Sequence, residues 1–255
     1  MYQLDKFKNI PGLIHGFSDV NDGNMSFDWG DENSVIEKRA RFLSHLGISV
    51  DNCVITRTRM SHGTDIEVIN GSLKGRGAKF SVSDEADVDA MITNEKDLFL
   101  VILTADCLPV IFYDPVKNAL ALAHLSRINT PENFTKKIIE RMEEEHGVEP
   151  GNIIAGIGPC IHKESYIFSA EDLGKRIPDE KVFNGFIADL PDGKKSIDLV
   201  GYNVRQMIFA GIKEDNIEIS GIDTAKDRNF FSHYRSRQNG EPEGRMATVV
   251  GIMRQ

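Results

Sequence analysis

The sequence predicts an α+β fold in which mixed β-sheets form layers flanked by helices, within a single domain covering residues 1–255. Short apolar segments that suit strands recur along the chain, among them 98–104, 119–123 and 153–157. Segments with apolar residues at helical spacing lie between them in no regular order. This irregular mixture fits an α+β or mixed α/β fold better than the repeated βαβ units of a doubly wound sheet.

Helices are expected where apolar residues recur every three or four positions. The clearest is 131–146, in which Phe134, Ile138 and Met142 share one face and Gly147 follows the end. The other expected helices are 34–46, 169–177 and 198–210. Strands are expected at 53–60, 65–69, 87–93, 98–104, 119–123, 153–157, 217–220 and 247–253, and a loop or hairpin up to residue 31.

Composition excludes several classes of protein. The net charge of −9 argues against nucleic-acid binding, which needs a basic face. No apolar run reaches the roughly 18 residues of a membrane span, and the first residues lack a signal-peptide pattern. Three cysteines, an odd number at wide spacing, do not suggest a disulfide framework. We therefore expect a cytoplasmic protein whose partner is a small molecule, with neither nucleic acid nor membrane as a partner.

Residues that can bind a metal stand at the ends of expected strands and turns. Cys107 follows the segment 98–104, His124 follows 119–123, and His62 lies in a tight turn. Two imidazoles and one thiolate form a ligand set that zinc accepts, with a fourth position open for catalysis. The alternative is that Cys107 is a small buried apolar residue and that both histidines are solvent-facing or satisfied.

Copper is not expected at these residues. Met60 lies two positions before His62, and blue-copper sites use two histidines, a cysteine and a weak methionine ligand. However, the chain has only 7 histidines and no His-x-His pair, too few for a multicopper cluster.

Several short motifs occur in a fixed order from residue 15 to the C-terminal strand. They are His15-Gly16-Phe17-Ser18, Ser61-His62-Gly63, Asp89-Ala90-Met91-Ile92-Thr93, Thr104-Ala105-Asp106-Cys107-Leu108-Pro109-Val110, Ala123-His124, Gly158-Pro159-Cys160-Ile161, Asp198-Leu199 with Asn203, Phe230-Phe231-Ser232-His233 and Gly244-Arg245-Met246. In this series the chain resembles the laccase-domain family, also called YfiH-like or polyphenol oxidase-like.

The resemblance implies a layered YfiH-like fold and a zinc site on His62, Cys107 and His124. It also implies a purine nucleoside substrate, because family activities are phosphorolysis of adenosine, inosine and methylthioadenosine and hydrolytic deamination of adenosine. Zinc deaminases need a carboxylate that carries protons, and Asp106 is the nearest candidate. The alternative for Asp106 is a hydrogen-bonding residue at a strand end.

The chain departs from the family pattern at its arginines. The family has His-Ala-Gly-Trp-Arg-Gly where this chain has His124-Leu125-Ser126-Arg127-Ile128-Asn129, and Tyr234 replaces one of a tandem arginine pair. Phosphate recognition relies on arginine, lysine or helix N-termini, so these changes weigh against phosphorolysis more than against metal binding. The candidate substrate-binding residues are Arg127, Cys160, His233, Arg235 and Arg245. Cys160 is expected to line the pocket or to pack in the core.

Two other functions use the same residues. In a metal-free hydrolase or amidase, Cys107 would be the nucleophile and His124 or His62 its base. In a degenerate, non-enzymatic member, the altered segment after His124 and the missing arginines would leave ligand binding on an intact fold.

Overall fold

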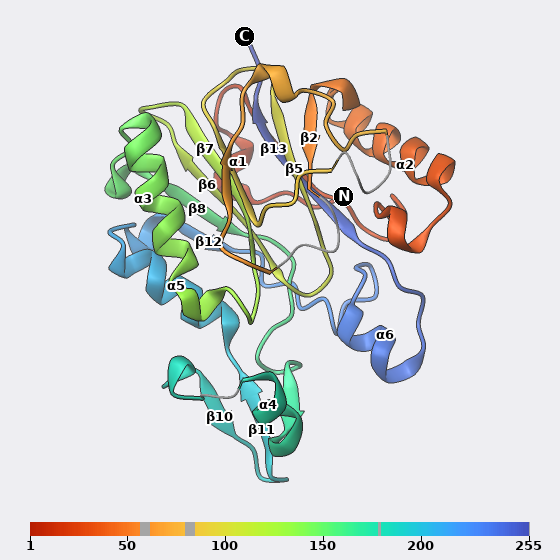
Figure 1. Ribbon diagram of the computed structural model, residues 1–255, viewed down its shortest axis with the longest axis vertical. Helices are drawn as coiled ribbons and strands as arrows, with labels where there is room; N and C mark the ends of the chain where they lie inside the picture. The colour runs from red at the N-terminus through yellow and green to blue at the C-terminus, as the bar shows by residue number, and fades with distance from the viewer. Residues whose placement is uncertain (57–61, 80–84, 178–179, 255) are drawn as a thin grey trace.

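Two β-sheets lie face to face at the centre of the computed structural model, and helices cover their outer faces (Figure 1). The structure describes residues 1–56, 62–79, 85–177 and 180–254. The six-stranded sheet has the order β12-β8-β6-β7-β4-β3 and the four-stranded sheet the order β1-β13-β5-β2. Each sheet contains both parallel and antiparallel pairs, which confirms the predicted layers of mixed sheets and helices.

The strand bounds are as follows. The six-stranded sheet consists of β3 Ile66–Val68, β4 Ala90–Thr93, β6 Leu108–Asp114, β7 Ala119–Leu125, β8 Ile154–Ile157 and β12 Ile217–Ile219. The four-stranded sheet consists of β1 Leu13–Phe17, β2 Cys53–Ile55, β5 Phe99–Thr104 and β13 Met246–Ile252.

The alternation of side chains along the strands builds the core. In β5, Leu100 and Ile102 join the apolar cluster between the two sheets, whereas Phe99, Val101 and Leu103 face the opposite side. Strands buried on both faces read as continuous apolar runs, which explains why 98–104 has no polar alternation.

Helices cover the outer faces of both sheets. The helices α3 Phe134–His146 and α5 Leu199–Phe209 cover the six-stranded sheet, and α2 Glu32–His45 covers the four-stranded sheet (Figure 1). A short helix, α1 Asp5–Lys8, precedes β1. Among the described residues, no helix combines the length and apolar character that a membrane span needs.

The ends of the helices follow from local chemistry. Helix α3 starts three residues later than predicted because Asn133 adopts a left-handed conformation, with φ 56°, after a 3₁₀ turn at Thr130–Glu132. It ends at His146, directly before Gly147 as predicted; Gly147 is left-handed, and its N–H donates to the Glu143 carbonyl. Ser169 caps the next helix by accepting the Asp172 N–H, and Asp198 caps α5 by accepting the Gly201 N–H.

A small three-stranded sheet with one helix projects from the sandwich (Figure 1). It consists of β9 Ile167–Ser169, α4 Ala170–Arg176, β10 Ile187–Asp189 and β11 Lys194–Ile197. A further helix, α6 His233–Asn239, precedes β13. Helix α4 was predicted, but β9, β10, β11 and α6 were not, because all four are short and lack a clear apolar period.

Three other parts of the chain differ from the predictions. The stretch up to residue 31 contains β1, whose His15 is buried, although a loop or hairpin was expected. Strand β6 was also missed, since its Pro109 and the preceding bend at 105–107 obscured a second apolar run. The strand expected at 53–60 ends at Ile55, and the part that includes Met60 lies outside the described residues.

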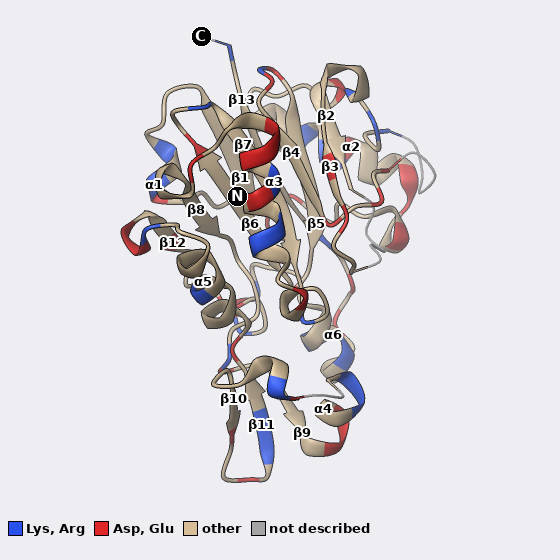
Figure 2. Cartoon of the chain, turned by 60° about the vertical axis from the view of Figure 1, so that its left-hand side comes forward, with Lys and Arg blue, Asp and Glu red and all other residues tan. Residues whose placement is uncertain are grey.

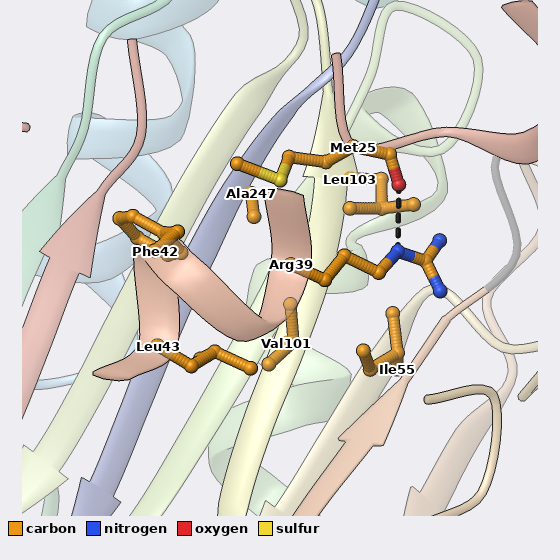
Figure 3. Close-up of a pocket in the computed structure, with 8 residues that line it drawn as sticks. All are labelled: Met25, Arg39, Phe42, Leu43, Ile55, Val101, Leu103 and Ala247. Carbon is orange, nitrogen blue, oxygen red and sulfur yellow. Dashed lines mark hydrogen bonds between the residues drawn. The ribbon is translucent and has the colours of Figure 1, made fainter. Parts of the chain in front are cut away.

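A buried ion pair connects α2 to the neighbouring loops. The Arg39 side chain is 2% exposed; its Nη2 donates to Glu85 Oε1 at 2.9 Å and its Nε donates to the Met25 carbonyl at 2.8 Å (Figure 3). Its Nη1 donates to the Gly77 carbonyl at 2.6 Å, and its guanidinium stacks on Phe27. The cavity beside Arg39 measures about 10 Å³, at most the size of one water, so this arginine acts in folding rather than in ligand binding.

We expect Arg39→Met to lower the free energy of unfolding by about 3–5 kcal/mol, because it removes one partner of a buried ion pair and two donors to carbonyls. Denaturant unfolding measures the change. Arg41→Met is the control, since Arg41 lies on the same helix, is exposed and donates one hydrogen bond, to the Asp22 carbonyl. Equal effects of the two substitutions would show that the Arg39 network contributes little.

Candidate metal centre and adjoining pocket

The antiparallel hairpin of β6 and β7 brings two of the predicted ligands together. Cys107 directly precedes β6, and His124 is the last residue but one of β7. Pro109 lies opposite His124 in the register of the two strands, so the start of β6 lies beside the end of β7. The third residue, His62, has φ 55°, and its ring centroid lies 5.2 Å from that of His124.

The three side chains converge on one point. The ligand atoms of His62, Cys107 and His124 all lie within 4.8 Å of one another. Bonds of about 2.0–2.3 Å to one ion place neighbouring ligand atoms roughly 3.5 Å apart. The group could therefore bind a metal ion after small adjustments of its side chains.

Asp89 orients His124. Its Oδ1 lies 2.8 Å from His124 Nδ1, and its backbone carbonyl accepts the His124 N–H at 2.8 Å. Asp89 is fully buried directly before β4, which pairs with β7. This contact leaves Nε2 of His124 for a metal, as in the carboxylate–histidine pairs of metal sites. Asp89 belongs to one of the family-like motifs, but the sequence predicted no role for it.

The centre holds a strongly coupled thiol and imidazole. Burial opposes the thiolate of Cys107, but hydrogen bonds and charge from His124 and His62 lower its pKa to about 6. Burial likewise opposes the charged form of His124, but Cys107 and Asp89 raise its pKa to about 9. Without a metal, the arrangement therefore favours a thiolate beside an imidazolium at neutral pH.

Asp106 connects the centre to the loops around it. It has the unusual φ of 80°, and its carboxylate accepts the Thr224 hydroxyl at 2.7 Å and the Tyr234 N–H at 2.6 Å. Its carbonyl accepts the Ile161 N–H. Burial raises the pKa of Asp106, although hydrogen bonds from Tyr234 and Thr224 act in the opposite direction. The residue thus has the structural role considered as its alternative, while its side chain also reaches the pocket described next.

A pocket of about 640 Å³ opens beside Cys107. This volume is within the usual range of roughly 300–1,000 Å³ for small-molecule sites. Tyr166 packs edge to face on Phe168 with centroids 4.7 Å apart, and Tyr234 lies 6.1 Å from Tyr166. The lining residues are Ala105, Asp106, Cys107, Tyr166, Ile167, Phe168, Ser169, Asp172, Arg176, Lys194, His233, Tyr234, Arg237 and Gln238.

The predicted substrate-binding residues are divided between the pocket and other places. His233 lines the pocket, and its Nδ1 lies 2.7 Å from Glu243 Oε1. Cys160 is fully buried in the core beneath the six-stranded sheet and is absent from the pocket wall. It was expected either to line the pocket or to pack in the core, and it packs in the core. Arg127 donates to the Arg176 carbonyl and interacts with Tyr166, which places it beside the pocket.

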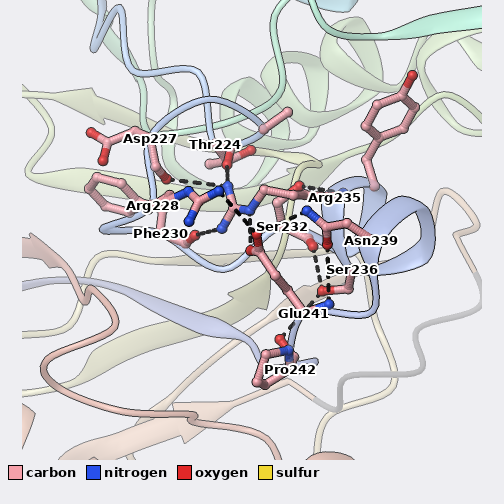
Figure 4. Close-up of polar contacts among 12 residues, drawn as sticks. Thr224, Asp227, Arg228, Phe230, Ser232, Arg235, Ser236, Asn239, Glu241 and Pro242 are labelled. Carbon is pink, nitrogen blue, oxygen red and sulfur yellow. Dashed lines mark hydrogen bonds and ion pairs between the residues drawn. The ribbon is translucent and has the colours of Figure 1, made fainter.

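Arg235 is engaged in a network of its own (Figure 4). Its Nε donates to Glu241 at 2.5 Å, Nη1 to the Thr224 carbonyl at 2.5 Å and Nη2 to the Phe230 carbonyl at 2.8 Å. Arg245 stacks on Trp29 at 3.8 Å and pairs with Glu243. The guanidinium groups of both arginines are held by protein groups outside the pocket wall.

Sequence reasoning missed much of the pocket wall. Arg176, Lys194 and Arg237 supply positive charge, and Tyr166 and Phe168 supply aromatic surface. They come from α4, α6 and the small sheet, which join residues distant along the chain. One sequence signal for this wall was available. The aromatic residues at 166 and 168 are two positions apart, which places them on the same face of a strand.

Comparison with known proteins identifies the family. The chain belongs to the family described as multi-copper polyphenol oxidoreductase laccase, which matches residues 14–253. This result confirms the resemblance found in the sequence motifs.

Curated relatives carry two kinds of enzyme name. The chain is 25% identical to the purine nucleoside phosphorylase YlmD of Bacillus subtilis, over 96% of this chain and 90% of that protein. It is also 25% identical to the adenosine deaminase RL5 of an unknown prokaryotic organism, over 98% and 94%.

Solved structures share the fold. YfiH of Bacillus licheniformis has a TM-score of 0.83 at 26% identity and covers 94% of this chain and 92% of its own. YlmD of Geobacillus stearothermophilus has a TM-score of 0.86 at 23% identity, with coverage of 98% and 94%.

We expect Asp89→Asn to weaken metal binding by about 10–100-fold, because the carboxylate fixes the ring orientation of His124 and supports its basicity. Competition titration with a coloured chelator measures the affinity. Asp65→Asn is the control, since the Asp65 backbone accepts the Asp89 N–H while its side chain is exposed. Equal affinities for wild type and Asp89→Asn would contradict the assigned role of Asp89.

Proposed function

We propose that this protein is a zinc-dependent enzyme of purine nucleosides, which catalyses phosphorolysis of adenosine or inosine, deamination of adenosine, or both. The observation that carries the proposal is that Cys107 belongs both to the three-residue ligand group and to the wall of the 640 Å³ pocket. A ligand in the pocket would therefore lie next to the metal. The names of the curated relatives support the same substrate class.

The ligand chemistry favours zinc. Two imidazole nitrogens and one thiolate match the mixed nitrogen and sulfur ligands of catalytic zinc, which retains an open position. When bound, zinc supplies Lewis acidity and lowers the pKa of water to about 7. The part of the chain before His62 that includes Met60, considered above for copper, lies outside the described residues.

The pocket residues have separate tasks in this proposal. Tyr234, which packs edge to face on the buried Phe168, offers aromatic surface on which a purine can stack. Burial and the neighbouring Cys107 raise the pKa of Tyr166 to about 12, so its hydroxyl remains a hydrogen-bond donor at neutral pH. Asp106 is the carboxylate nearest to Cys107 along the pocket wall and is our candidate for carrying the proton.

We expect protein purified without added metal to contain about one zinc per chain and to turn over adenosine or inosine. Cys107→Ser should lower both the zinc content and the rate by at least about tenfold, because it replaces the thiolate ligand. Metal analysis and product assays, with and without phosphate, measure these effects.

Cys160→Ser is the matched control, because Cys160 lies in the core and is absent from the metal-ligating group and from the pocket wall. Zinc content should remain unchanged in this variant. Protein without metal that also fails to convert either nucleoside would contradict the proposed function.

A metal-free cysteine hydrolase is the second candidate, and the low pKa of Cys107 favours it. Iodoacetamide separates the two functions. If zinc holds the thiolate, alkylation of Cys107 should be slow and should accelerate by at least about tenfold after a chelator is added. Rapid alkylation of Cys107 that is insensitive to the chelator would instead support the hydrolase.

A further inference from the structure

The pocket carries three positive side chains from three different elements. Arg176 is the last residue of α4, Lys194 is the first residue of β11 and Arg237 belongs to α6. Figure 2 shows basic residues on these elements in the lower part of the molecule. This grouping stands out in a chain with a net charge of −9, because a random distribution would favour acidic neighbours.

The three cations differ in their ion pairing. Within the described part of the chain, neither Arg176 nor Arg237 forms an ion pair, whereas Lys194 pairs with the exposed Asp192 at 2.7 Å. Arg176 also lies over the Phe168 ring, with its guanidinium carbon 5.6 Å from the centroid. An anion would therefore meet available donors here.

The carboxylates of the pocket wall are already occupied by protein donors. Asp106 accepts from the Thr224 hydroxyl and the Tyr234 N–H. Asp172 accepts from the Ser169 hydroxyl at 2.8 Å as part of the cap of α4. His233, also in the wall, interacts with Glu243. Three cations against two hydrogen-bonded carboxylates leave the wall with an excess of positive charge.

We propose that Arg176, Lys194 and Arg237 bind a phosphate group in this pocket. The inference rests on the proposed function, and it assigns the anion to residues other than Arg235 and Arg245, whose guanidinium groups bind protein atoms. Guanidinium groups suit phosphate because their planar donors match two of its oxygens. The phosphate belongs either to inorganic phosphate as co-substrate or to a nucleoside 5′-monophosphate.

The aromatic residues connect this anion site to the metal centre. Tyr166, Phe168 and Tyr234 share the pocket wall with both Cys107 and the three cations. In phosphorolysis, a phosphate oxygen forms a bond to ribose C1′ as the glycosidic bond to the purine breaks. The purine leaves with that electron pair and takes up a proton, so a phosphate bound beside a stacked nucleoside is what the reaction requires.

The first experiment measures binding alone. We expect calorimetric titration at fixed, low ionic strength to show that Arg176→Gln and Arg237→Gln each weaken binding of phosphate or of AMP by about tenfold, the loss expected for one charge-assisted hydrogen bond. Adenosine binding should change little. Lys175→Gln is the matched control, because Lys175 precedes Arg176 on α4, pairs with the exposed Glu171 and is absent from the pocket wall.

The two sources of phosphate are distinguished by kinetics. If inorganic phosphate is the ligand, both variants should raise KM for phosphate in inosine phosphorolysis and leave KM for adenosine in deamination unchanged. If a nucleotide is the ligand, wild type should bind AMP more tightly than adenosine, and the variants should lose that difference.

Three results would overturn the inference: wild type binds neither phosphate nor AMP, the variants bind both as wild type does, or Lys175→Gln loses as much affinity as Arg176→Gln. These binding results do not depend on turnover. An enzyme that binds phosphate through Arg176 and Arg237 but converts no nucleoside would contradict the proposed function and leave the phosphate site in place.

Discussion

The antiparallel register of β6 and β7 is the constraint on which the candidate site depends. It sets Pro109 opposite His124. The thiol of Cys107, directly before β6, therefore lies near the imidazole of His124 at the end of β7. A shift by one residue would turn every side chain of one strand to the other face and disrupt the close packing of the apolar side chains on both faces. Packing of the core thus determines the geometry of the polar site.

Polar contacts then fix the orientation of the site residues and connect them to neighbouring segments. Asp89, directly before the adjacent strand β4, fixes the His124 ring, and Asp106 binds Thr224 and the first turn of α6 through Tyr234. The left-handed conformations of His62 and Asp106 carry a conformational cost for side chains other than glycine, and such residues gather at functional sites. The pocket forms where these loops meet the small sheet of β9, β10 and β11.

The sequence predicted the α+β layers and the main helices, because apolar period and helix caps are local signals. It also predicted that His62, Cys107 and His124 meet, from their places at strand ends and turns and from the family motifs, and the three side chains do converge. It missed Asp89 as a partner of His124, since their contact depends on the pairing of β4 with β7. The sequence also predicted Arg235 as a substrate-binding residue, but its donors are held by backbone carbonyls and Glu241. The cations of the pocket, Arg176 and Arg237, are 61 positions apart (237 − 176) and meet only through the tertiary fold.

X-ray absorption spectroscopy of the zinc-loaded protein is the decisive measurement for the proposed centre, because it reports the atoms bound to the metal. We expect one sulfur at about 2.3 Å and two imidazole nitrogens at about 2.0–2.1 Å, with the sulfur lost in Cys107→Ser. A metal surrounded only by oxygen and nitrogen in the wild-type protein, or a sulfur ligand that persists in Cys107→Ser, would contradict the proposed centre.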